Sequence, residues 1–369
     1  MTVTRVYLDY NATVPILPAV GEAVAEALRL DGNPSSVHAE GRAARARVED
    51  ARAAVATSLG AAAAAVVFTA SGSEANALAL RGTDRARILV AAVEHASVRQ
   101  GARDITTIPC DGDGIVRLDA LERLLAADER PALVSVMAAN NETGVIQPLA
   151  DVVRLARAHG ALVHTDAVQA YGRLALDFAG LGVDLMSVSA HKIGGPKGAG
   201  ALVVRAPLEL AALVRGGGQE RGRRAGTEAL PAIVGFGVAA GHVPRLVDDA
   251  PRLERWRDAF EAALSGARVI GAGVRRLPNT SAIVMPGVAA ATQVMAFDLD
   301  GFAVSAGAAC SSGKVGPSHV LAAMGLDRAQ AGSAIRVSSG WRTTEPELDD
   351  FAAAWCALRA RLGGARAAA

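Results

Sequence analysis

The sequence predicts an α/β fold in which helices cover a mostly parallel sheet, together with a smaller α+β domain. Three observations support this prediction. The 369 residues are too many for one ordinary core and about right for two, and 51% of them are apolar. Strand-like and helix-like segments alternate over much of the chain. Several strand-like segments are continuous apolar runs, which burial on both faces of a parallel sheet explains.

The elements of the larger domain follow from the spacing of apolar residues. A helical period predicts helices, and short apolar runs predict strands. The N-terminus runs into a strand-like segment at 6–10, and a turn-rich loop at 32–38 separates the first two helices. Helices are expected at 20–30, 43–59, 73–80, 118–126 and 149–159, and strands at 66–69, 88–93, 105–109, 133–137, 162–165, 185–188 and 201–204.

The pattern changes after Val243 and Pro244 and predicts the smaller domain. Its expected elements are a long amphipathic helix at 253–264, strands at 281–285 and 334–338, and helices at 292–299, 319–324 and 346–362. We therefore expect a large domain of residues 16–245 and a small domain made of residues 1–15 and 246–369.

Composition excludes several classes of function. The formal net charge of +1 gives no basic face for nucleic acid. No apolar run is long enough to span a bilayer, and no secretory signal precedes the first strand. Cys110, Cys310 and Cys356 are too few and too far apart for a disulfide framework or a CxxC metal site. We expect a cytoplasmic protein with no bound metal, no membrane partner and no direct nucleic-acid partner.

Lys192 is the first candidate for chemistry. The chain has lysine only at positions 192, 197 and 314, and arginine elsewhere. Arginine cannot form a Schiff base, because its guanidinium group stays protonated. Lys192 is therefore a candidate reactive amine, with an ordinary structural lysine as the alternative. Lys197 lies in a Gly-Pro-Lys-Gly turn and is interpreted as structural.

Polar side chains follow the predicted strands, where an open α/β sheet binds its ligands. They are His95, Asn141, Asp166, Gln169, His191 and Lys192. A carboxylate at the end of a buried strand needs a cationic partner, which a protonated pyridine nitrogen or an arginine supplies; structural capping is the alternative for Asp166. His95 is either structural or a ring stacked on a flat cofactor. The segment 71–74, Ser-Gly-Ser-Glu, is either an ordinary capping box or an anion site at a helix N-terminus.

Three later features of the sequence are also candidates for a functional role. The glycine- and arginine-rich segment 216–227 is either a solvated loop or a loop that reaches across a dimer to a phosphate. Cys310 lies among small residues that offer no packing, which suits a nucleophilic thiol. Arg336 interrupts an apolar strand, as a clamp for a substrate carboxylate or as one half of a buried ion pair.

Taken together, these motifs resemble the NifS/IscS-like cysteine desulfurases, which are fold type I pyridoxal 5'-phosphate (PLP) enzymes of the class V aminotransferase type. The matching segments occur in order over nearly the whole chain, at 7–13, 32–36, 94–95, 140–144, 166–169, 189–192, 224–227, 309–312 and 335–336. The resemblance implies a mostly parallel, seven-stranded-type sheet in a large PLP-binding domain. It also implies a small domain that carries the cysteine loop and the substrate-carboxylate arginine.

The resemblance implies a role for each matching residue. Lys192 would form the Schiff base and move a proton, Asp166 would keep the pyridine nitrogen protonated, and His95 would stack on the ring. Asn141 and Gln169 would bind the ring oxygen. The phosphate would be bound by Gly72, Ser73, Ser189 and His191, with Thr227 of the partner subunit. Arg336, with Asn11, would bind the substrate carboxylate. Asn76-Ala77 stands where relatives often have two polar residues.

The resemblance also implies the reaction and the partners. Cys310 would attack the sulfur of L-cysteine, give a persulfide and release L-alanine. A homodimer is expected, and the sulfur acceptor would be an iron–sulfur scaffold, with which Cys310 can transiently share a cluster, or a tRNA-thiolation protein. Two alternatives stay open: a related PLP-dependent aminotransferase or lyase in which Cys310 is incidental, and a binding protein on a decayed enzyme fold.

Overall fold

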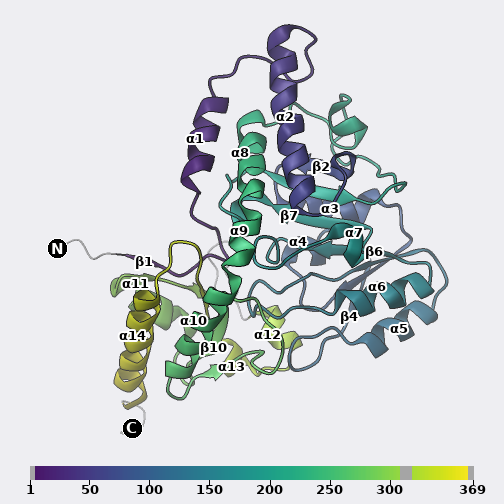
Figure 1. The fold of residues 1–369 in the computed structure, drawn as a ribbon. Helices are drawn as coiled ribbons and strands as arrows, with labels where there is room; N and C mark the ends of the chain where they lie inside the picture. Colours follow the sequence, from purple (N-terminus) through teal and green to yellow (C-terminus); the bar gives the residue numbers. More distant parts are fainter. Residues whose placement is uncertain (1–4, 308–317, 365–369) are drawn as a thin grey trace.

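The computed structural model describes residues 5–307 and 318–364, and its centre is a seven-stranded sheet (Figure 1). In spatial order the strands are β2 (Val66–Thr69), β8 (Gly200–Val204), β7 (Leu185–Ser189), β6 (Leu162–Asp166), β5 (Ala132–Ser135), β3 (Arg87–Ala91) and β4 (Ile105–Ile108). Strand β8 runs antiparallel to both of its neighbours, and the other neighbouring pairs are parallel. The predicted mostly parallel α/β sheet is therefore confirmed.

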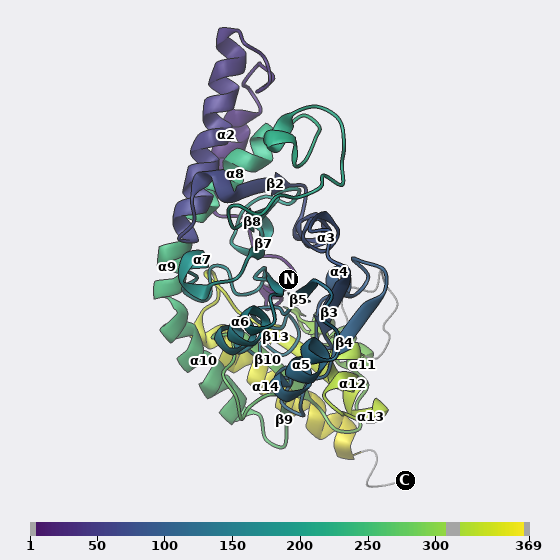
Figure 2. The ribbon, with the colours of Figure 1, turned by 90° about the vertical axis from the view of Figure 1, so that its right-hand side faces the viewer.

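Helices cover both faces of this sheet (Figure 2). Successive strand residues point to opposite faces, so that Leu89 and Val90 of β3 belong to different hydrophobic clusters. The cluster on one face includes residues of α3 (Gly72–Gly82) and α4 (Ala96–Arg99). The larger cluster on the other face includes residues of α1 (Pro18–Ala27), α2 (Ala39–Ser58), α5 (Leu118–Ala126), α6 (Leu149–Ala158), α7 (Phe178–Leu181) and α8 (Leu230–Gly241).

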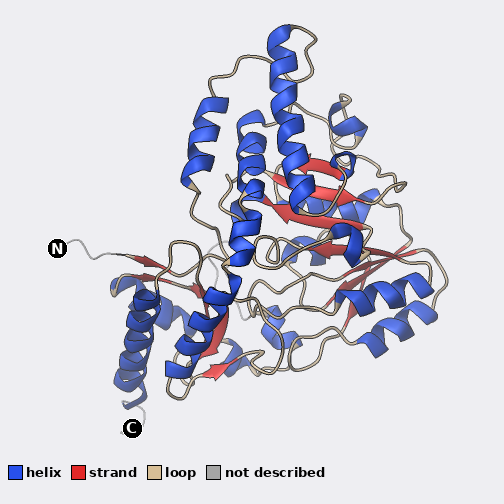
Figure 3. Cartoon of the chain, viewed as in Figure 1, coloured by secondary structure: helices blue, strands red, loops and turns tan. Residues whose placement is uncertain are grey.

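A second, four-stranded sheet stands apart from the first (Figure 3). Its strands are β12 (Ser305–Ala306), β13 (Ala334–Ser338), β10 (Thr280–Val284) and β9 (Arg268–Val269), in that order, and every neighbouring pair is antiparallel. The phenylalanines 260, 297 and 351 form its core with Trp355, and they come from α10 (Ala250–Ala263), α11 (Ala290–Leu299) and α14 (Glu345–Gly364). Strand β1 (Val6–Tyr7) pairs in parallel with β11 (Phe302–Ala303), so the N-terminal segment joins the C-terminal third.

The short connecting elements complete the fold. They are α9 (Val243–Asp248), α12 (His319–Ala323), α13 (Arg328–Ala331) and the 3-10 helices η1 (Ala63–Ala65), η2 (Ala190–Lys192) and η3 (Gln219–Gly222). The predicted division into domains at residue 245 stays a prediction. The largest hydrophobic cluster joins residues from both sides of that boundary, such as Ala240 and Leu277.

Helix α8 is the main element that the sequence did not predict. Ile233, Phe236 and Ala239 are among its many buried residues, and the helix has no polar face. A helix that is apolar all round lacks the amphipathic period by which helices are recognised in a sequence. Elsewhere the predicted bounds differ from the observed ones by a few residues, as strand 133–137 does from β5.

Within the described parts of the chain, no single helix has the length and apolar composition needed to cross a membrane. The bent pair formed by Leu230–Gly241 and Val243–Ala263 meets that test by length and composition alone.

A buried ion pair fixes the glycine- and arginine-rich segment 216–227 against the large sheet. Arg52 Nη1 of α2 lies 2.7 Å from Glu220 Oε2 of η3, and the two side chains are 6% and 2% exposed. The carboxylate also accepts a 2.9 Å hydrogen bond from the amide of Phe68. Because both charges are out of water, each depends on the other for compensation.

We predict that Glu220→Gln lowers the free energy of unfolding by about 3–5 kcal/mol, because the Arg52 charge stays buried without its buried counterion. Urea denaturation measures the loss. Glu49→Gln is the matched control: Glu49 also pairs with Arg52, at 3.1 Å, but it is half-exposed. We expect the control to cost less than about 1 kcal/mol. Equal losses in the two variants would contradict the prediction.

Candidate active site

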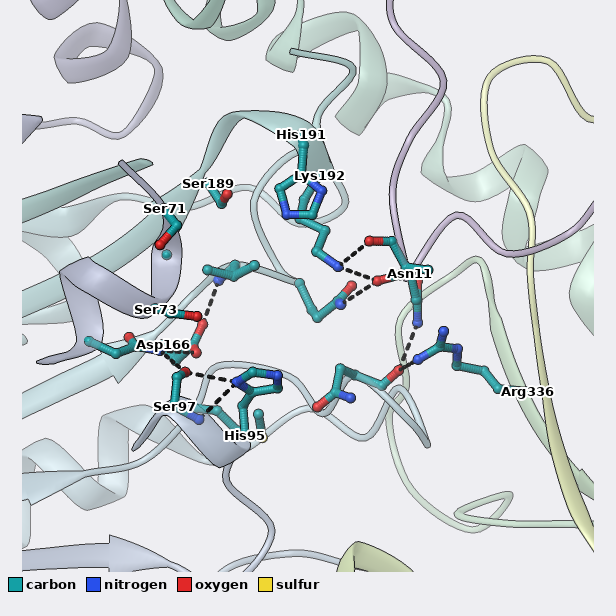
Figure 4. A pocket seen from close by; sticks show the side chains of 17 residues that line it. Asn11, Ser71, Ser73, His95, Ser97, Asp166, Ser189, His191, Lys192 and Arg336 are labelled. Carbon is teal, nitrogen blue, oxygen red and sulfur yellow. Dashed lines mark hydrogen bonds between the residues drawn. The ribbon is translucent and has the colours of Figure 1, made fainter. Parts of the chain in front are cut away.

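A cavity of about 310 Å³ lies at the carboxyl ends of β3, β5, β6 and β7 (Figure 4). Among the predicted site residues, it is lined by Asn11, Gly72, Ser73, His95, Asn141, Asp166, Gln169, Ser189, His191, Lys192 and Arg336. Thr227 lines a separate pocket beside Glu220 and Arg224. Cys310 lies outside the described residues.

One end of the cavity is the N-terminus of α3. Ser71 Oγ accepts a hydrogen bond from the amide of Glu74 at 3.2 Å, and Glu74 Oε2 accepts one from the amide of Ala70 at 2.9 Å. Ser71 is therefore the predicted N-cap, and Glu74 reaches back as predicted but to the amide one residue before the cap. The positive end of the helix dipole faces the cavity. A Cβ atom at Gly72 would lie 2.9 Å from Val168 Cγ2, so a larger side chain would displace Val168 from the cavity wall. The arrangement is suited to an anion.

Asp166 is connected to His95 through two polar side chains. Asp166 Oδ2 accepts a hydrogen bond from Asn76 Nδ2 at 2.7 Å, and the same nitrogen donates to Ser97 Oγ at 2.9 Å. Ser97 Oγ lies 2.7 Å from His95 Nδ1, which also accepts from the Ser97 amide at 3.1 Å. Because Nδ1 accepts a hydrogen bond, the neutral His95 ring carries its proton on Nε2.

Sequence reasoning did not assign Asn76 and Ser97 to the site. Asn76 lies one helical turn after Gly72 on α3, so that the two residues share a helix face. That spacing is the signal that identifies Asn76. Ser97 has no comparable signal, because its place depends on how the loop after β3 folds back toward Asp166.

Lys192 and Gln169 meet at the backbone of the N-terminal segment. Lys192 Nζ donates to the carbonyl oxygens of Asn11 and Ala12, the second at 2.8 Å. Gln169 Nε2 also donates to the Asn11 oxygen, at 2.9 Å. Gln169 Oε1 is buried and has no hydrogen-bond partner within the described residues, so the cavity presents an unsatisfied acceptor there.

Arg336 lies in an ion pair within the protein. Arg336 Nη2 donates to Asp9 Oδ1 at 2.7 Å, and Nη1 donates to the Asn141 carbonyl at 2.9 Å. Arg336 Nε is buried and without a partner in the part of the chain that the structure describes. The buried ion pair was one of the two alternatives for this residue. The other alternative, that Arg336 binds a substrate carboxylate, stays a prediction; the unpartnered Nε is a donor that such a carboxylate can use.

Known proteins resemble this chain over nearly its whole length. A model of the family described as aminotransferase class-V matches residues 6–351. A cysteine desulfurase of Cereibacter sphaeroides is 43% identical over 362 residues, which are 94% of this chain and 93% of the relative. An IscS-like cysteine desulfurase of Mycobacterium tuberculosis is 39% identical over 371 residues, 93% of each chain. The X-ray structure of a NifS-like protein from Rickettsia africae has a TM-score of 0.89 at 34% identity, covering 95% of this chain and 98% of that one.

This chain belongs to the class-V aminotransferase family, among its NifS- and IscS-like cysteine desulfurases. The family is PLP-dependent, and the cavity of this cysteine desulfurase fits that cofactor. The end of α3 suits a phosphate, Asp166 suits a protonated ring nitrogen, and Lys192 supplies a primary amine. The buried, unpartnered Oε1 of Gln169 marks a polar position that a bound group can satisfy.

His191 contributes a neutral ring to the wall of this cavity. Burial, together with the smaller effect of the charges of Lys192, Lys197 and Arg173, lowers its pKa to about 4. The ring is therefore neutral at pH 7, and its Nδ1 lies 3.2 Å from Thr13 Oγ1. A neutral imidazole among cations is a suitable hydrogen-bonding group for a phosphate oxygen, because it adds no charge of its own that must be desolvated.

A buried histidine supports the strand that ends in Asp166. His164 of β6 bridges the neighbouring strands, with Nδ1 at 2.8 Å from Ser135 Oγ and Nε2 at 2.9 Å from Ser187 Oγ. Burial lowers the pKa of this fully buried ring to about 3. His164 therefore stays neutral in the folded desulfurase throughout the physiological range.

We predict that His164 makes the desulfurase less stable as the pH falls from about 6.5 to about 3. The unfolded chain protonates the ring near pH 6.5 and the folded chain does not, so unfolding takes up a proton in this window. In His164→Gln the free energy of unfolding should depend less steeply on pH, by about 1.4 kcal/mol per pH unit between pH 4 and 6. Urea denaturation at several pH values measures the slope. His159→Gln, at an exposed position, is the control, and equal slopes for His164→Gln and wild type would refute the assignment.

Proposed function

We propose that this protein converts L-cysteine to L-alanine in a PLP-dependent reaction and leaves the sulfur as a persulfide on Cys310. The observation that carries the proposal is the meeting of Lys192, Asp166 and Arg336 in one cavity with the N-terminus of α3. An amine, a carboxylate, a guanidinium group and an anion site are the groups that an amino acid and a phosphorylated pyridine require. Relatives named cysteine desulfurase, 39% and 43% identical, support the choice of reaction.

Each residue has one task in the proposed reaction. PLP, when bound, supplies an electron-withdrawing ring that makes bonds at the substrate Cα and Cβ easier to break. Lys192 holds the cofactor covalently and afterwards moves the proton of the substrate Cα. Asp166 keeps a proton on the ring nitrogen, and Asn76 fixes its carboxylate through the 2.7 Å hydrogen bond. His95 lies against the ring, with its Nε2 proton set by the hydrogen bonds at Nδ1.

Binding is divided between the two ends of the cavity. The phosphate is bound by Gly72, Ser73, Ser189 and His191, with Thr227 from the partner subunit, and the ring oxygen by Asn141 and Gln169. Arg336 binds the substrate carboxylate with Asn11. To do so, the guanidinium group exchanges or shares its contact with Asp9, which holds it in the fork geometry that a carboxylate needs.

The sulfur step joins Cys310 to the substrate. The Cys310 thiolate attacks the sulfur of L-cysteine, an S–S bond forms and the C–S bond breaks. The transferred sulfur is oxidised to the persulfide level, and the substrate carbon is reduced. A proton then reaches the substrate Cβ, so that the products are L-alanine and the Cys310 persulfide, and no external oxidant is needed.

The partners follow from this reaction. The persulfide passes to a sulfur-acceptor protein, either an iron–sulfur scaffold or a tRNA-thiolation protein. The enzyme acts as a homodimer; Thr227 lines a pocket apart from the cavity of its own chain, which supports a contact with the phosphate of a second copy. It acts in the cytoplasm, where a free persulfide is protected from oxidation.

We predict that Lys192→Arg abolishes turnover, by more than about 10³-fold, because arginine keeps the charge but cannot hold the cofactor covalently. Borohydride reduction followed by peptide mass spectrometry locates covalently bound PLP. Lys197→Arg is the matched control at an exposed position. It should retain both the labelled Lys192 peptide and the activity. Label on Lys197 in the wild type would disprove the assignment.

We also predict that Cys310→Ala binds PLP and L-cysteine but forms no persulfide, because no acceptor remains for the sulfur. Alanine and sulfide are quantified after addition of cysteine and a reductant. Cys356→Ala, which removes a partly buried thiol of α14, should behave as wild type. Wild-type turnover by Cys310→Ala would refute the role of this thiol.

A further inference from the structure

Glu142 lies beside both described ends of the segment that carries Cys310. Ser318 Oγ donates a hydrogen bond to Glu142 Oε2. On the other side, a Cβ atom added to Gly307 would lie only 3.0 Å from the same oxygen. In the sequence, Gly307 directly precedes residues 308–317 and Ser318 directly follows them. One carboxyl group, itself only 5% exposed, therefore lies between the two described ends.

The second end is fixed by further contacts. Ser318 is the N-cap of α12, and its Oγ accepts a hydrogen bond from the Leu321 amide at 3.2 Å while it donates to Glu142. His319 Nε2 lies 2.9 Å from the carbonyl oxygen of Glu94, the residue before His95. The start of α12 is thus held at Glu142 and at the loop that carries the ring-stacking histidine.

Glu142 itself belongs to a rigid turn beside Arg336. Asn140 Oδ1 accepts hydrogen bonds from the amides of Glu142 and Thr143, at 2.8 and 2.9 Å, which fixes the turn locally. The carbonyl of the neighbouring Asn141 accepts from Arg336 Nη1. The same short turn therefore contacts the carboxylate-binding arginine on one side and Ser318 on the other.

We propose that Glu142 is a positioning residue for sulfur transfer, which holds Ser318 by a hydrogen bond and lies against Gly307, beside the Asn141–Arg336 contact. The inference rests on the proposed function, because it gives Cys310 the role of sulfur acceptor. Glu142 acts through these neighbours and makes no bond to the substrate.

The charge state of Glu142 is set by its neighbours. Burial raises its pKa to about 7, and the Ser318 hydrogen bond, Arg336 and His95 oppose that rise. When Glu142 is ionised, Ser318 must donate to it, because a carboxylate only accepts. When Glu142 is protonated, the contact loses its charge assistance and weakens. The holding contact is therefore stronger above pH 7 than below it.

The experiment compares two steps in the PLP-loaded enzyme. Binding of L-cysteine is followed by the absorbance of the bound cofactor, and persulfide formation on Cys310 by quenched-flow mass spectrometry. We expect Glu142→Gln to slow persulfide formation by about 10- to 100-fold, the effect of a misplacement near 1 Å, while the Kd for cysteine changes less than about twofold. The wild-type rate of persulfide formation should rise between pH 6 and 8, and the variant should lack that rise.

Three further variants separate positioning from helix capping. Ser318→Ala should reproduce the loss, and Ser318→Thr, which keeps a hydroxyl group, should restore most of the rate. Asp327→Ala is the matched control: it removes the N-cap of α13, where Asp327 Oδ1 accepts from the Gln330 amide at 2.8 Å, without a contact to Glu142. It should form persulfide at the wild-type rate.

Two results overturn the proposal: persulfide formation at the wild-type rate in both Glu142→Gln and Ser318→Ala, or a loss of cysteine affinity as large as the loss of rate. If Glu142→Gln does not fold, as judged by circular dichroism, Ser318→Ala decides by the same criteria. Failure of the proposed function is distinct, because the wild-type enzyme would then form no persulfide on Cys310.

Discussion

The burial of charged groups around the cavity is the constraint on which the rest of the site depends. Asp166 is 6% exposed and the Arg336 side chain 4%. Out of water, each charge needs hydrogen bonds or a counterion, or its burial costs several kcal/mol. Asn76 and the Val168 amide meet this need for Asp166, and Asp9 meets it for Arg336. The same contacts fix the direction of each group, so the site is ordered before substrate arrives.

Asn11 connects the two sheets at this site. Its amide donates to Ser338 Oγ at the end of β13, and its carbonyl accepts from Lys192 and Gln169, which follow strands β7 and β6 of the large sheet. Its side-chain nitrogen donates to Thr280 Oγ1 at 3.0 Å on β10. A residue from the N-terminal segment thus holds Lys192 in register with the strand that carries Arg336. In the proposed reaction, the substrate carboxylate and the substrate nitrogen would meet groups from different parts of the fold, whose relative placement sets the geometry.

The turn of residues 140–144 connects Arg336 with Ser318, which directly follows the segment that carries Cys310. Its Asn141 carbonyl contacts Arg336, and its Glu142 side chain contacts Ser318. Sulfur transfer requires a thiol to approach a substrate that is already held by its carboxylate and its nitrogen. A short turn that contacts both Arg336 and Ser318 is suited to that requirement, because its own shape is fixed by Asn140.

Local sequence determined the elements with a clear period, such as β2 and α3, and the residue types placed at strand ends, such as Asp166 and His191. Sequence order and spacing also identified the family. The tertiary structure alone decided which other elements and side chains support these strands and site residues. Helix α8 has no polar face to reveal it, and the contacts of Glu142 with Ser318 and of Arg52 with Glu220 join residues 176 and 168 positions apart. Such contacts leave no periodic trace in a sequence, because only the folding of the whole chain brings their partners together.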